Sequence, residues 1–192
     1  MNSSMNKPAV KSLLALALAS TLLLGTAPAS AHDEGESRLS PSAQALLGDA
    51  RRATAAFVDI NVAIDGGGYG PPPFADAQGI TCISSAQPGK GAMGIHYVNF
   101  SLLDPAVDAL RPEALIYESM PDGKLRLVGV EYIVFQDAWP DKKPPRLFGQ
   151  DFHLTPVGNR YDIPAYYALH VWMWEPNRSG LFADWNPAVK CP

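Results

Sequence analysis

Apolar residues recur at steps of three and four along the chain that follows Ser40 and Pro41. This stripe consists of Ala43, Leu46, Leu47, Ala50, Thr54, Phe57, Ile60 or Asn61, and Ile64. The spacing predicts an amphipathic helix of about 20–24 residues. Serine caps free N–H groups and proline suits the first helical position, so the helix is expected to begin at this pair. The glycines and prolines of DGGGYGPPP (65–73) are expected to end it.

The pattern changes to β-structure further along the chain. Four stretches rich in Val, Ile, Leu and aromatic residues are predicted strands, namely 93–100, 114–118, 125–135 and 166–174. PDGK (121–124) favours a hairpin between the second and third strands, and proline-rich connectors follow at 139–149 and 155–164. The expected fold class is α+β, with one long N-terminal amphipathic helix packed on a mostly antiparallel sheet or partial β-barrel. Long loops rich in proline and glycine complete it.

The first 31 residues are predicted to be a secretory signal peptide. Lys7 and Lys11 form a short basic region, 12–24 is apolar, and Ala29-Ser30-Ala31 is a small-x-small cleavage site. The apolar run is shorter than the roughly 20 residues of a bilayer-spanning helix, which disfavours a membrane anchor. We therefore expect a secreted or periplasmic protein with no anchor after cleavage. It would have a disordered start at 32–39 and a single globular domain at 40–192.

The charge balance disfavours nucleic acid as a partner. The chain has 19 acidic and 15 basic residues, for a net charge of −4, and cleavage would remove two of the lysines. No basic patch appears in the remainder, which also disfavours binding to anionic membrane surfaces. The oligomeric state stays open.

The chain has two cysteines, Cys82 and Cys191. In an exported protein an even pair usually forms a disulfide, and only one pairing exists here. The bridge would tie the last residues to the loop before the strand at 93–100. Two thiols at a metal or redox site are the alternative, although the pair is far apart and not in a C-x-x-C arrangement.

Strand alternation places three polar residues among apolar neighbours. His96 lies in the strand at 93–100, Glu131 in the strand at 125–135 and His170 in the strand at 166–174. A buried carboxylate is costly unless it is paired or bound to a cation, and a buried imidazole needs partners for its nitrogens. We therefore expect the three residues to satisfy one another, directly or through a shared ion.

Two histidines and one carboxylate are a familiar ligand set for a divalent transition metal such as iron, zinc or manganese. His153, in FGQDFHLTP, is a further and weaker candidate ligand because it lies in a loop. A hydrogen-bonded core cluster without a metal is the alternative explanation. No compact motif such as H-E-x-x-H decides between these readings.

Aromatic residues gather near the C-terminus and around the first histidine strand. Their simplest role is to build the core. The alternative is an aromatic-lined pocket for a small apolar or planar ligand, formed by Tyr97, Tyr167, Trp172 and Trp174.

Several longer motifs resemble those of a family of uncharacterised exported bacterial proteins. They are CISSAQPGKGAMGIHYVN, RPEALIYE, LRLVGVEY, LFGQDF and YYALHVWMWEPNRSGLFADWNPAVKC, with ARRATAAFVDINVAIDGGGYG in the helix region. The resemblance implies that Cys82 and Cys191 are the family's cysteines and that His96, Glu131 and His170 are its matching polar positions. Arg178 departs from the proline expected at that turn. No activity comes with the resemblance.

The sequence therefore predicts an exported protein that binds a divalent metal or small ligand through a buried His/Glu cluster. Two alternatives remain open. One is a non-catalytic envelope protein in which the same cluster is structural. The other is a metal-independent hydrolase that uses Glu131 with His96 as an acid–base pair. Whether the protein is an enzyme is left open.

Overall fold

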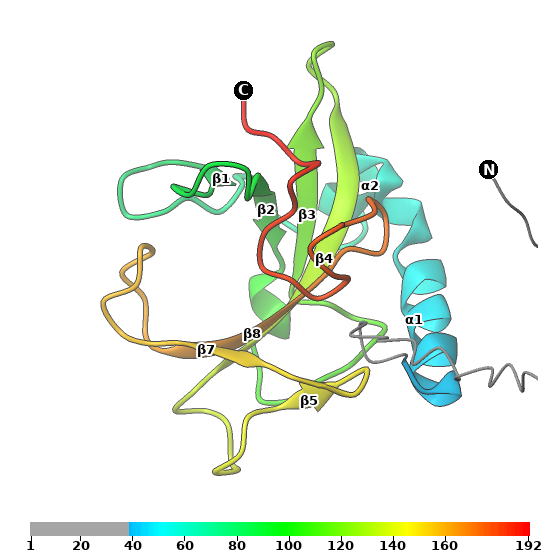
Figure 1. Ribbon diagram of the computed structural model, residues 1–192, viewed down its shortest axis with the longest axis vertical. Helices are drawn as coiled ribbons and strands as arrows, with labels where there is room; N and C mark the ends of the chain where they lie inside the picture. The colour runs from blue at the N-terminus through cyan, green and yellow to red at the C-terminus, as the bar shows by residue number, and fades with distance from the viewer. Residues whose placement is uncertain (1–38) are drawn as a thin grey trace, which may run out of the picture. The chain divides into compact units, whose positions relative to one another are not determined.

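The computed structural model of the protein describes residues 39–192 (Figure 1). The signal peptide predicted at 1–31, and all but the last residue of the stretch predicted to be disordered, lie outside this range. The helical elements are α1 (Pro41–Ala53), η1 (Ala55–Val58), α2 (Ile60–Asp65) and η2 (Phe100–Leu102). The strands are β1 (Cys82–Ser84), β2 (Ala92–Val98), β3 (Ala114–Ser119), β4 (Leu125–Phe135), β5 (Arg146–Leu147), β6 (Gln150–Asp151), β7 (His153–Thr155) and β8 (Tyr166–Val171). No helix in the described part is long and apolar enough to cross a membrane.

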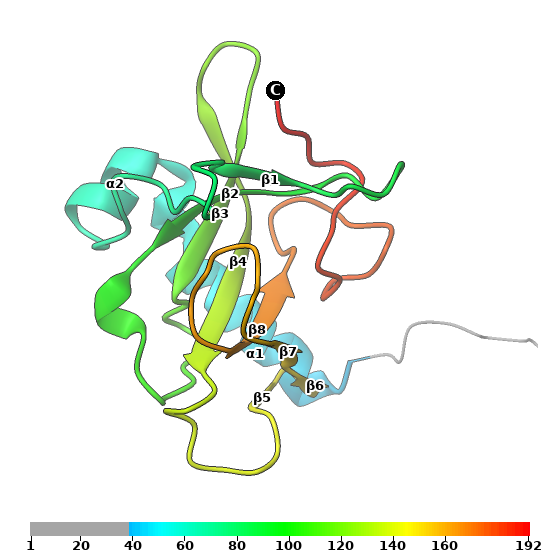
Figure 2. The same ribbon diagram turned by 90° about the vertical axis from the view of Figure 1, so that its left-hand side faces the viewer.

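Six strands form one sheet in the order β1-β2-β3-β4-β8-β7, and every neighbouring pair is antiparallel. Figures 1 and 2 show the strands turning progressively, so that the sheet curls into a half-barrel. The short strands β5 and β6 pair separately. The predicted antiparallel sheet with helices is confirmed. The hairpin expected at PDGK connects β3 to β4.

The region predicted as one amphipathic helix contains α1, η1 and α2 in succession. Ser40 caps α1 as expected, because its Oγ accepts a hydrogen bond from the backbone N–H of Ala43. Thr54 interrupts the helix, and its hydroxyl donates back to the carbonyl of Ala50 at 2.9 Å. Asp59 then caps α2 by accepting from the N–H of Asn61. Side-chain hydrogen bonds of this kind compete with a continuous helix, so the stripe is distributed over three shorter elements.

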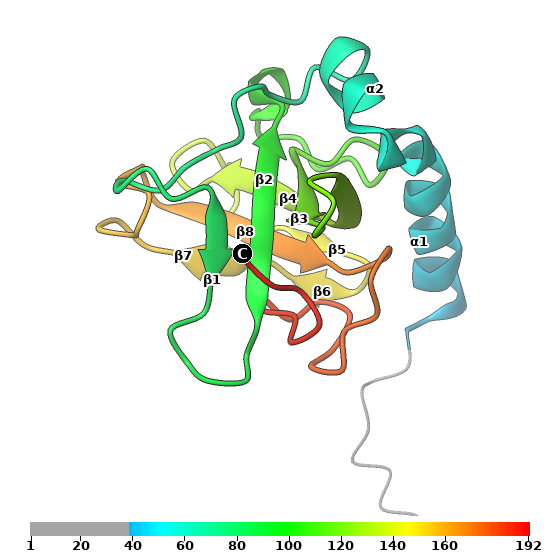
Figure 3. The same cartoon turned by 90° about the horizontal axis from the view of Figure 1, so that it is seen from above.

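The two faces of the sheet are covered by different parts of the chain. The helix face packs against α1 and α2, and it carries buried residues of all the central strands, namely Leu115, Tyr117, Leu127, Val130, Tyr132, Leu169 and Val171. The tail face carries Ala92, Ile116, Val128 and Trp172, which pack against Val189 and Cys191 of the C-terminal segment. Figures 2 and 3 show the helices on one side of the sheet and the C-terminal segment on the other.

A β-bulge changes the side-chain alternation in β4. The register with β3 shifts between Ile116 and Tyr117, which pair with Gly129 and Leu127. Simple alternation places Leu127 on the same face as Glu131, but the structure places it on the helix face. A bulge adds one residue to a strand and so reverses the side-chain phase beyond it. The faces that simple alternation assigns to the side chains of β4 are therefore correct only on the Glu131 side of the bulge.

The C-terminal segment is fixed to the sheet by a disulfide and a pair of backbone hydrogen bonds. Cys82 and Cys191 form the predicted bridge, across 109 residues of sequence. Ala92 and Asn186 exchange two backbone hydrogen bonds at 3.2 and 3.0 Å. Gly91 is needed at this crossing, because a Cβ there would collide with the Asn186 backbone. The tail is thus held against β1 and β2.

Candidate metal centre

The sheet register brings His96, Glu131 and His170 together on the tail face. Glu131 on β4 is the direct cross-strand partner of His170 on β8. His96 lies two strands away on β2, a separation of about 10 Å at the usual strand spacing. The intervening strand β3 places Ala114 beside Glu131. Its single methyl group leaves room for the two longer side chains to meet above β3.

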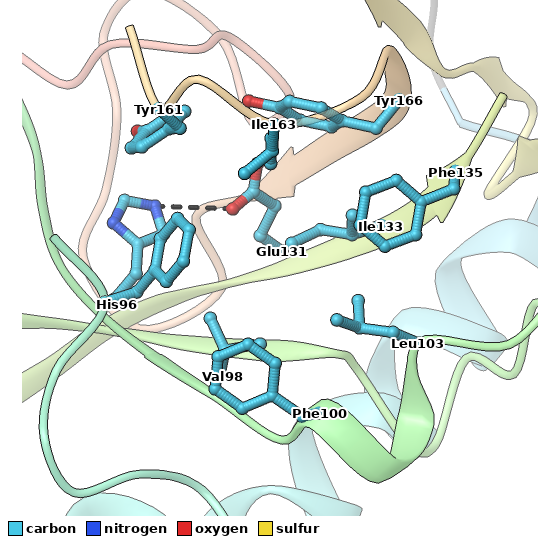
Figure 4. Close-up of a pocket in the computed structure, with 11 residues that line it drawn as sticks. His96, Val98, Phe100, Leu103, Glu131, Ile133, Phe135, Tyr161, Ile163 and Tyr166 are labelled. Atoms are coloured by element: carbon cyan, nitrogen blue, oxygen red, sulfur yellow. Dashed lines mark ion pairs between the residues drawn. The ribbon is translucent and has the colours of Figure 1, made fainter. Parts of the chain in front are cut away.

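The three side chains converge in the interior. Their exposed fractions are 4% for His96, 7% for Glu131 and 4% for His170. His96 Nε2 is 3.4 Å from Glu131 Oε2, the contact drawn dashed in Figure 4. His170 Nε2 is 3.6 Å from Glu131 Oε1. Both separations exceed the usual length of an N–H···O hydrogen bond, so the carboxyl group lies between the two imidazoles without closing on either.

Burial governs the charge of all three groups. Desolvation lowers the pKa of His96 to about 4 and that of His170 to about 3, so both imidazoles are neutral at neutral pH. Desolvation, together with the charges of Asp184 and Glu113, raises the pKa of Glu131 to about 8. An ion pair would shift these pKa values in the opposite directions. The contacts are therefore not imidazolium–carboxylate salt bridges in the ion-free protein.

One ring nitrogen in the cluster has no protein partner. Among the buried side-chain nitrogen and oxygen atoms of the described residues, His170 Nε2 and Trp174 Nε1 make no hydrogen bond. The guanidinium of Arg51 lies 4.8 Å above the Trp174 ring, whereas His170 Nε2 faces Glu131. Buried polar atoms are nearly always hydrogen-bonded, and exceptions call for an explanation.

Each imidazole is supported by groups outside the cluster. The His96 ring hydrogen-bonds the backbone of Gly94, and Gly94 itself has φ +102° and no room for a Cβ beside the Tyr117 carbonyl. His170 stacks on Trp172 with ring centroids 6.2 Å apart and planes 14° apart. Its Nδ1 lies 3.9 Å from Asp184 Oδ1. These contacts orient the Nε2 atoms of both rings toward Glu131.

The arrangement can hold a metal ion. One ligand atom from each residue lies within 4.8 Å of the others. Ligands about 2.1 Å from a tetrahedral ion are about 3.4 Å apart, given usual metal–ligand bond lengths. His96 Nε2 is 3.4 Å from Glu131 Oε2 and His170 Nε2 is 3.6 Å from Oε1, so each imidazole lies near that distance from one of the two carboxyl oxygens. Neutral imidazole and carboxylate are the forms that bind such ions.

Two cavities border the cluster. The first, of about 220 Å³, is lined by His96 and Glu131 and by aromatic side chains that include Phe74, Tyr161 and Tyr166 (Figure 4). The second, of about 340 Å³, is lined by Glu131, His170, His153, Asp184 and Arg160. Glu131 lies on both cavities, so the cluster separates a largely apolar cavity from a more polar one.

His153 lies outside the three-residue cluster. It is on the edge strand β7, its side chain is 62% exposed, and its Nδ1 lies 3.1 Å from Asp184 Oδ1. The sequence predicts a loop for this region. The structure has a short edge strand instead, and the His153 side chain is exposed on it. Asp184 therefore stands between His153 and His170.

The four aromatic residues predicted to form a ligand pocket do not line the cavity beside Glu131. Tyr97 and Tyr167 alternate with His96 and His170 along their strands, so they pack on the helix face, as does Trp174. Trp172 stacks on His170 without reaching the cavity. The pocket expected from these four side chains stays a prediction.

The residues that do line the cavity come mostly from loops and strand ends. Phe74 reaches it from the segment after the proline run, and it forms a β-bridge with His96. Tyr161 and Ile163 reach it from the connector at 155–164. Asp184 reaches the second cavity from the C-terminal tail. Periodicity does not reveal these residues, because turns set their positions.

No protein-family model, no curated protein and no solved structure matches this chain. The site must therefore be interpreted from its own geometry.

Proposed function

We propose that the protein binds a divalent transition metal, such as iron, zinc or manganese, through His96, Glu131 and His170. The observation that carries the proposal is the unpartnered Nε2 atom of His170, buried and facing the carboxyl group of Glu131. A metal ion between these groups would give that nitrogen its partner.

Charge supports the same proposal. Two neutral imidazoles and a desolvated carboxyl group form an interior site that lacks positive charge. A cation would supply it, and Glu131 would then be stable as a carboxylate despite its burial. Asp184, close to His170 Nδ1, would act as the outer carboxylate that commonly orients a metal-bound imidazole.

A purely structural cluster is less well supported. Buried polar clusters contribute to stability when every member is hydrogen-bonded. Here the imidazole–carboxyl separations of 3.4 and 3.6 Å are too long for good hydrogen bonds. The metal-independent hydrolase would use the contact between His96 and Glu131, but it leaves His170 Nε2 without a partner.

We also propose that the protein is exported. The Cys82–Cys191 disulfide supports this, because such bridges persist in oxidising compartments. The apolar run and small-x-small site of the first 31 residues support it from the sequence. Mass spectrometry of the protein recovered from the periplasm or the medium should give a chain that begins at His32. An intact N-terminus in the cytoplasmic fraction would contradict export.

Metal binding is tested by isothermal titration calorimetry of the chelator-treated protein with Zn²⁺, Mn²⁺ and anaerobic Fe²⁺. We expect one site per chain for at least one of these ions. Replacing a ligand by His170→Ala or Glu131→Gln should weaken binding by at least about 100-fold, since even outer-shell changes cost 10–100-fold. His153→Ala is the matched control, because it removes a neighbouring histidine that lies outside the cluster.

Two results would reject a metal at this cluster. One is the absence of any stoichiometric binding to the wild-type protein. The other is binding that survives His170→Ala but is lost in His153→Ala, which would place the ion at the exposed histidine. Far-ultraviolet circular dichroism of each variant checks that the fold is kept.

A further inference from the structure

The cavity beside His96 and Glu131 has a polar end and an apolar end. On β4, Glu131, Ile133 and Phe135 alternate toward the same face. Because β2 and β4 are both antiparallel to β3, they run in the same direction. Along both strands the lining changes from a polar side chain to apolar ones, from His96 to Val98 on β2 and from Glu131 to Phe135 on β4.

The remaining walls of the cavity are apolar or aromatic. Figure 4 shows Tyr161, Ile163 and Tyr166 on one side and Val98, Phe100 and Leu103 on the other. Phe100 is 63% exposed, which is unusual for a phenylalanine, and its ring lies 6.3 Å from that of Phe74. Since Phe100 both lines the cavity and reaches solvent, it marks the mouth. A ligand can therefore enter without unfolding the sheet.

The size of the cavity limits its ligand to about one ring. An engineered apolar cavity of about 150 Å³ holds benzene. At about 220 Å³, this cavity has room for a single ring with small substituents. The aromatic walls provide edge and face contacts for such a ring.

The polar end selects the head group. A hydroxyl group both donates and accepts hydrogen bonds, so it can pair with an imidazole nitrogen and a carboxyl oxygen together. A carboxylate head would lose its water and find no cationic side chain among the residues that line the cavity. A purely apolar ligand would leave the polar end without a partner.

We propose that this cavity binds a small phenol or aromatic alcohol, with its hydroxyl group at His96 and Glu131 and its ring toward Phe135. The inference deepens the proposed function and rests on it, because the side chains that would hold the ion also form the polar end of the cavity. The ligand class can still be measured separately from the metal.

Three ligands that share a methylphenyl ring and differ at the para position test the proposal: p-cresol, toluene and p-toluate. Each is titrated calorimetrically into the chelator-treated wild-type protein. We expect p-cresol to bind at one site per chain. Toluene should bind about 3–10-fold more weakly, the usual value of one net hydrogen bond. The carboxylate of p-toluate should reduce affinity by more than about tenfold, because its desolvation is uncompensated.

Two substitutions fill the cavity from opposite walls. Ile163→Trp and Leu103→Trp each place an indole in the space that the ring would occupy, and each should reduce p-cresol affinity by more than about tenfold. Val157→Trp makes the same kind of change at a side chain that is 73% exposed and does not line the cavity. It should change the affinity less than about twofold.

The outcomes separate the two proposals. Metal binding in wild type without saturable p-cresol binding overturns the ligand class and leaves the metal centre intact. Binding of p-cresol without binding of any metal rejects the metal centre and keeps the assignment of the cavity. Equal affinity for toluene and p-cresol overturns the role of the polar end. Unchanged p-cresol affinity in both folded cavity-filling variants overturns the location.

Discussion

The two faces of the sheet treat buried polar groups in opposite ways. On the helix face, Tyr69, Tyr117 and Tyr132 are buried, and each hydroxyl donates to a backbone carbonyl at 2.6–2.7 Å. On the tail face, His96, Glu131 and His170 are equally buried, but their mutual contacts are too long for good hydrogen bonds. The three tyrosine hydroxyl groups are satisfied by protein atoms alone, and the His–Glu–His cluster is not.

This difference indicates which face stabilises the fold and which face is available for a ligand. Satisfied polar groups and close packing make a core rigid, and the helix face has both. An incompletely satisfied buried cluster destabilises the apo protein and gains when a ligand completes it. The strand β8 presents one residue of each kind side by side, Leu169 and His170.

The largest effect is expected from Leu169→Ala on the helix face. Leu169 is 2% exposed, and truncation of such a leucine costs about 2–5 kcal/mol of unfolding free energy. Metal binding per folded chain should stay unchanged. His170→Leu, one residue along the same strand, should lower the unfolding free energy of the metal-free protein by less than Leu169→Ala does, as measured by urea titration. The same variant should abolish metal binding. The reverse ranking of the two variants would break the contrast between the faces.

The stability of the protein should depend on the Cys82–Cys191 disulfide, which holds the C-terminal segment on the tail face. Replacing both cysteines, Cys82→Ser with Cys191→Ser, should lower the unfolding free energy by about 2–5 kcal/mol, because the bridge closes a long loop. Denaturant titration without reductant measures it, and the reduced wild-type protein is the control. A loss below about 1 kcal/mol would show that packing of the tail is sufficient without the bridge.

Glu113 offers a buried carboxyl group that is matched to Glu131 but has a backbone partner. Its Oε2 accepts from the N–H of Ile133 at 2.9 Å, and desolvation raises its pKa to about 8. Because the folded-state pKa lies above that of the unfolded chain, Glu113 favours folding most at low pH. That contribution is lost between about pH 4.5 and 8.

The variant Glu113→Gln should therefore make stability less dependent on pH in this range. The slope should change by up to about 1.4 kcal/mol per pH unit, the value for one proton. Urea unfolding at pH 5, 6.5 and 8 in the presence of a chelator measures it. An identical slope in wild type and variant would show that the Glu113 carboxyl group ionises at its ordinary pKa.

A smaller effect is expected from removing one tyrosine hydroxyl of the helix face. Tyr117→Phe leaves the carbonyl of Phe57 without its 2.6 Å partner. The expected cost is about 1–2 kcal/mol, because a part-buried acceptor loses its hydrogen bond. Urea unfolding measures the loss. A neutral effect would mean that water replaces the hydroxyl and that this part of the helix face is open.

The smallest effect is expected at the exposed histidine. His153→Ala should change the unfolding free energy by less than about 0.5 kcal/mol, because the side chain is 62% exposed. A loss of several kcal/mol in the unfolding free energy, measured by urea titration, would show that His153 supports the structure of the polar cavity. Such a result would contradict the assignment of His153 to a position outside the three-residue cluster.

The sequence predicts the central strands well because their apolar runs are long. The predicted strand at 125–135 coincides with β4, and the others begin within one residue of β2, β3 and β8. Each of the two histidine strands ends earlier than predicted. Asn99 caps η2 by accepting from the N–H of Ser101, and Trp172 donates from its backbone to Leu181. Apolar composition alone does not reveal such local hydrogen bonds.

The convergence of His96, Glu131 and His170 is predicted from their burial alone. A polar side chain in an apolar strand needs a partner, and the chain offers few. The strand order that joins them is not in the pattern, because β2, β4 and β8 are brought together by pairings that span whole hairpins. The bulge at Ile116 and the cavity walls from loops are invisible for the same reason.

The disulfide follows from simple counting, whereas the strands β5, β6 and β7 do not follow from any pattern. They have two or three residues each; β5 lies in the connector predicted at 139–149, and β6 and most of β7 lie between the two predicted connectors. Such short strands are set by neighbouring chains rather than by their own composition. His153 lies on one of them, and its exposure could not be read from the sequence.

His170 lies on β8, the last strand along the chain, so the set of three side chains is complete only when β8 is paired with β4. Until β8 pairs with β4, Glu131 and His170 belong to distant parts of an open polypeptide. An ion held by all three residues would therefore need the β4–β8 pairing in place. Divalent metals differ in intrinsic affinity for the same donors. Which metal ion is bound would therefore depend on the metals available in the compartment as much as on the three side chains.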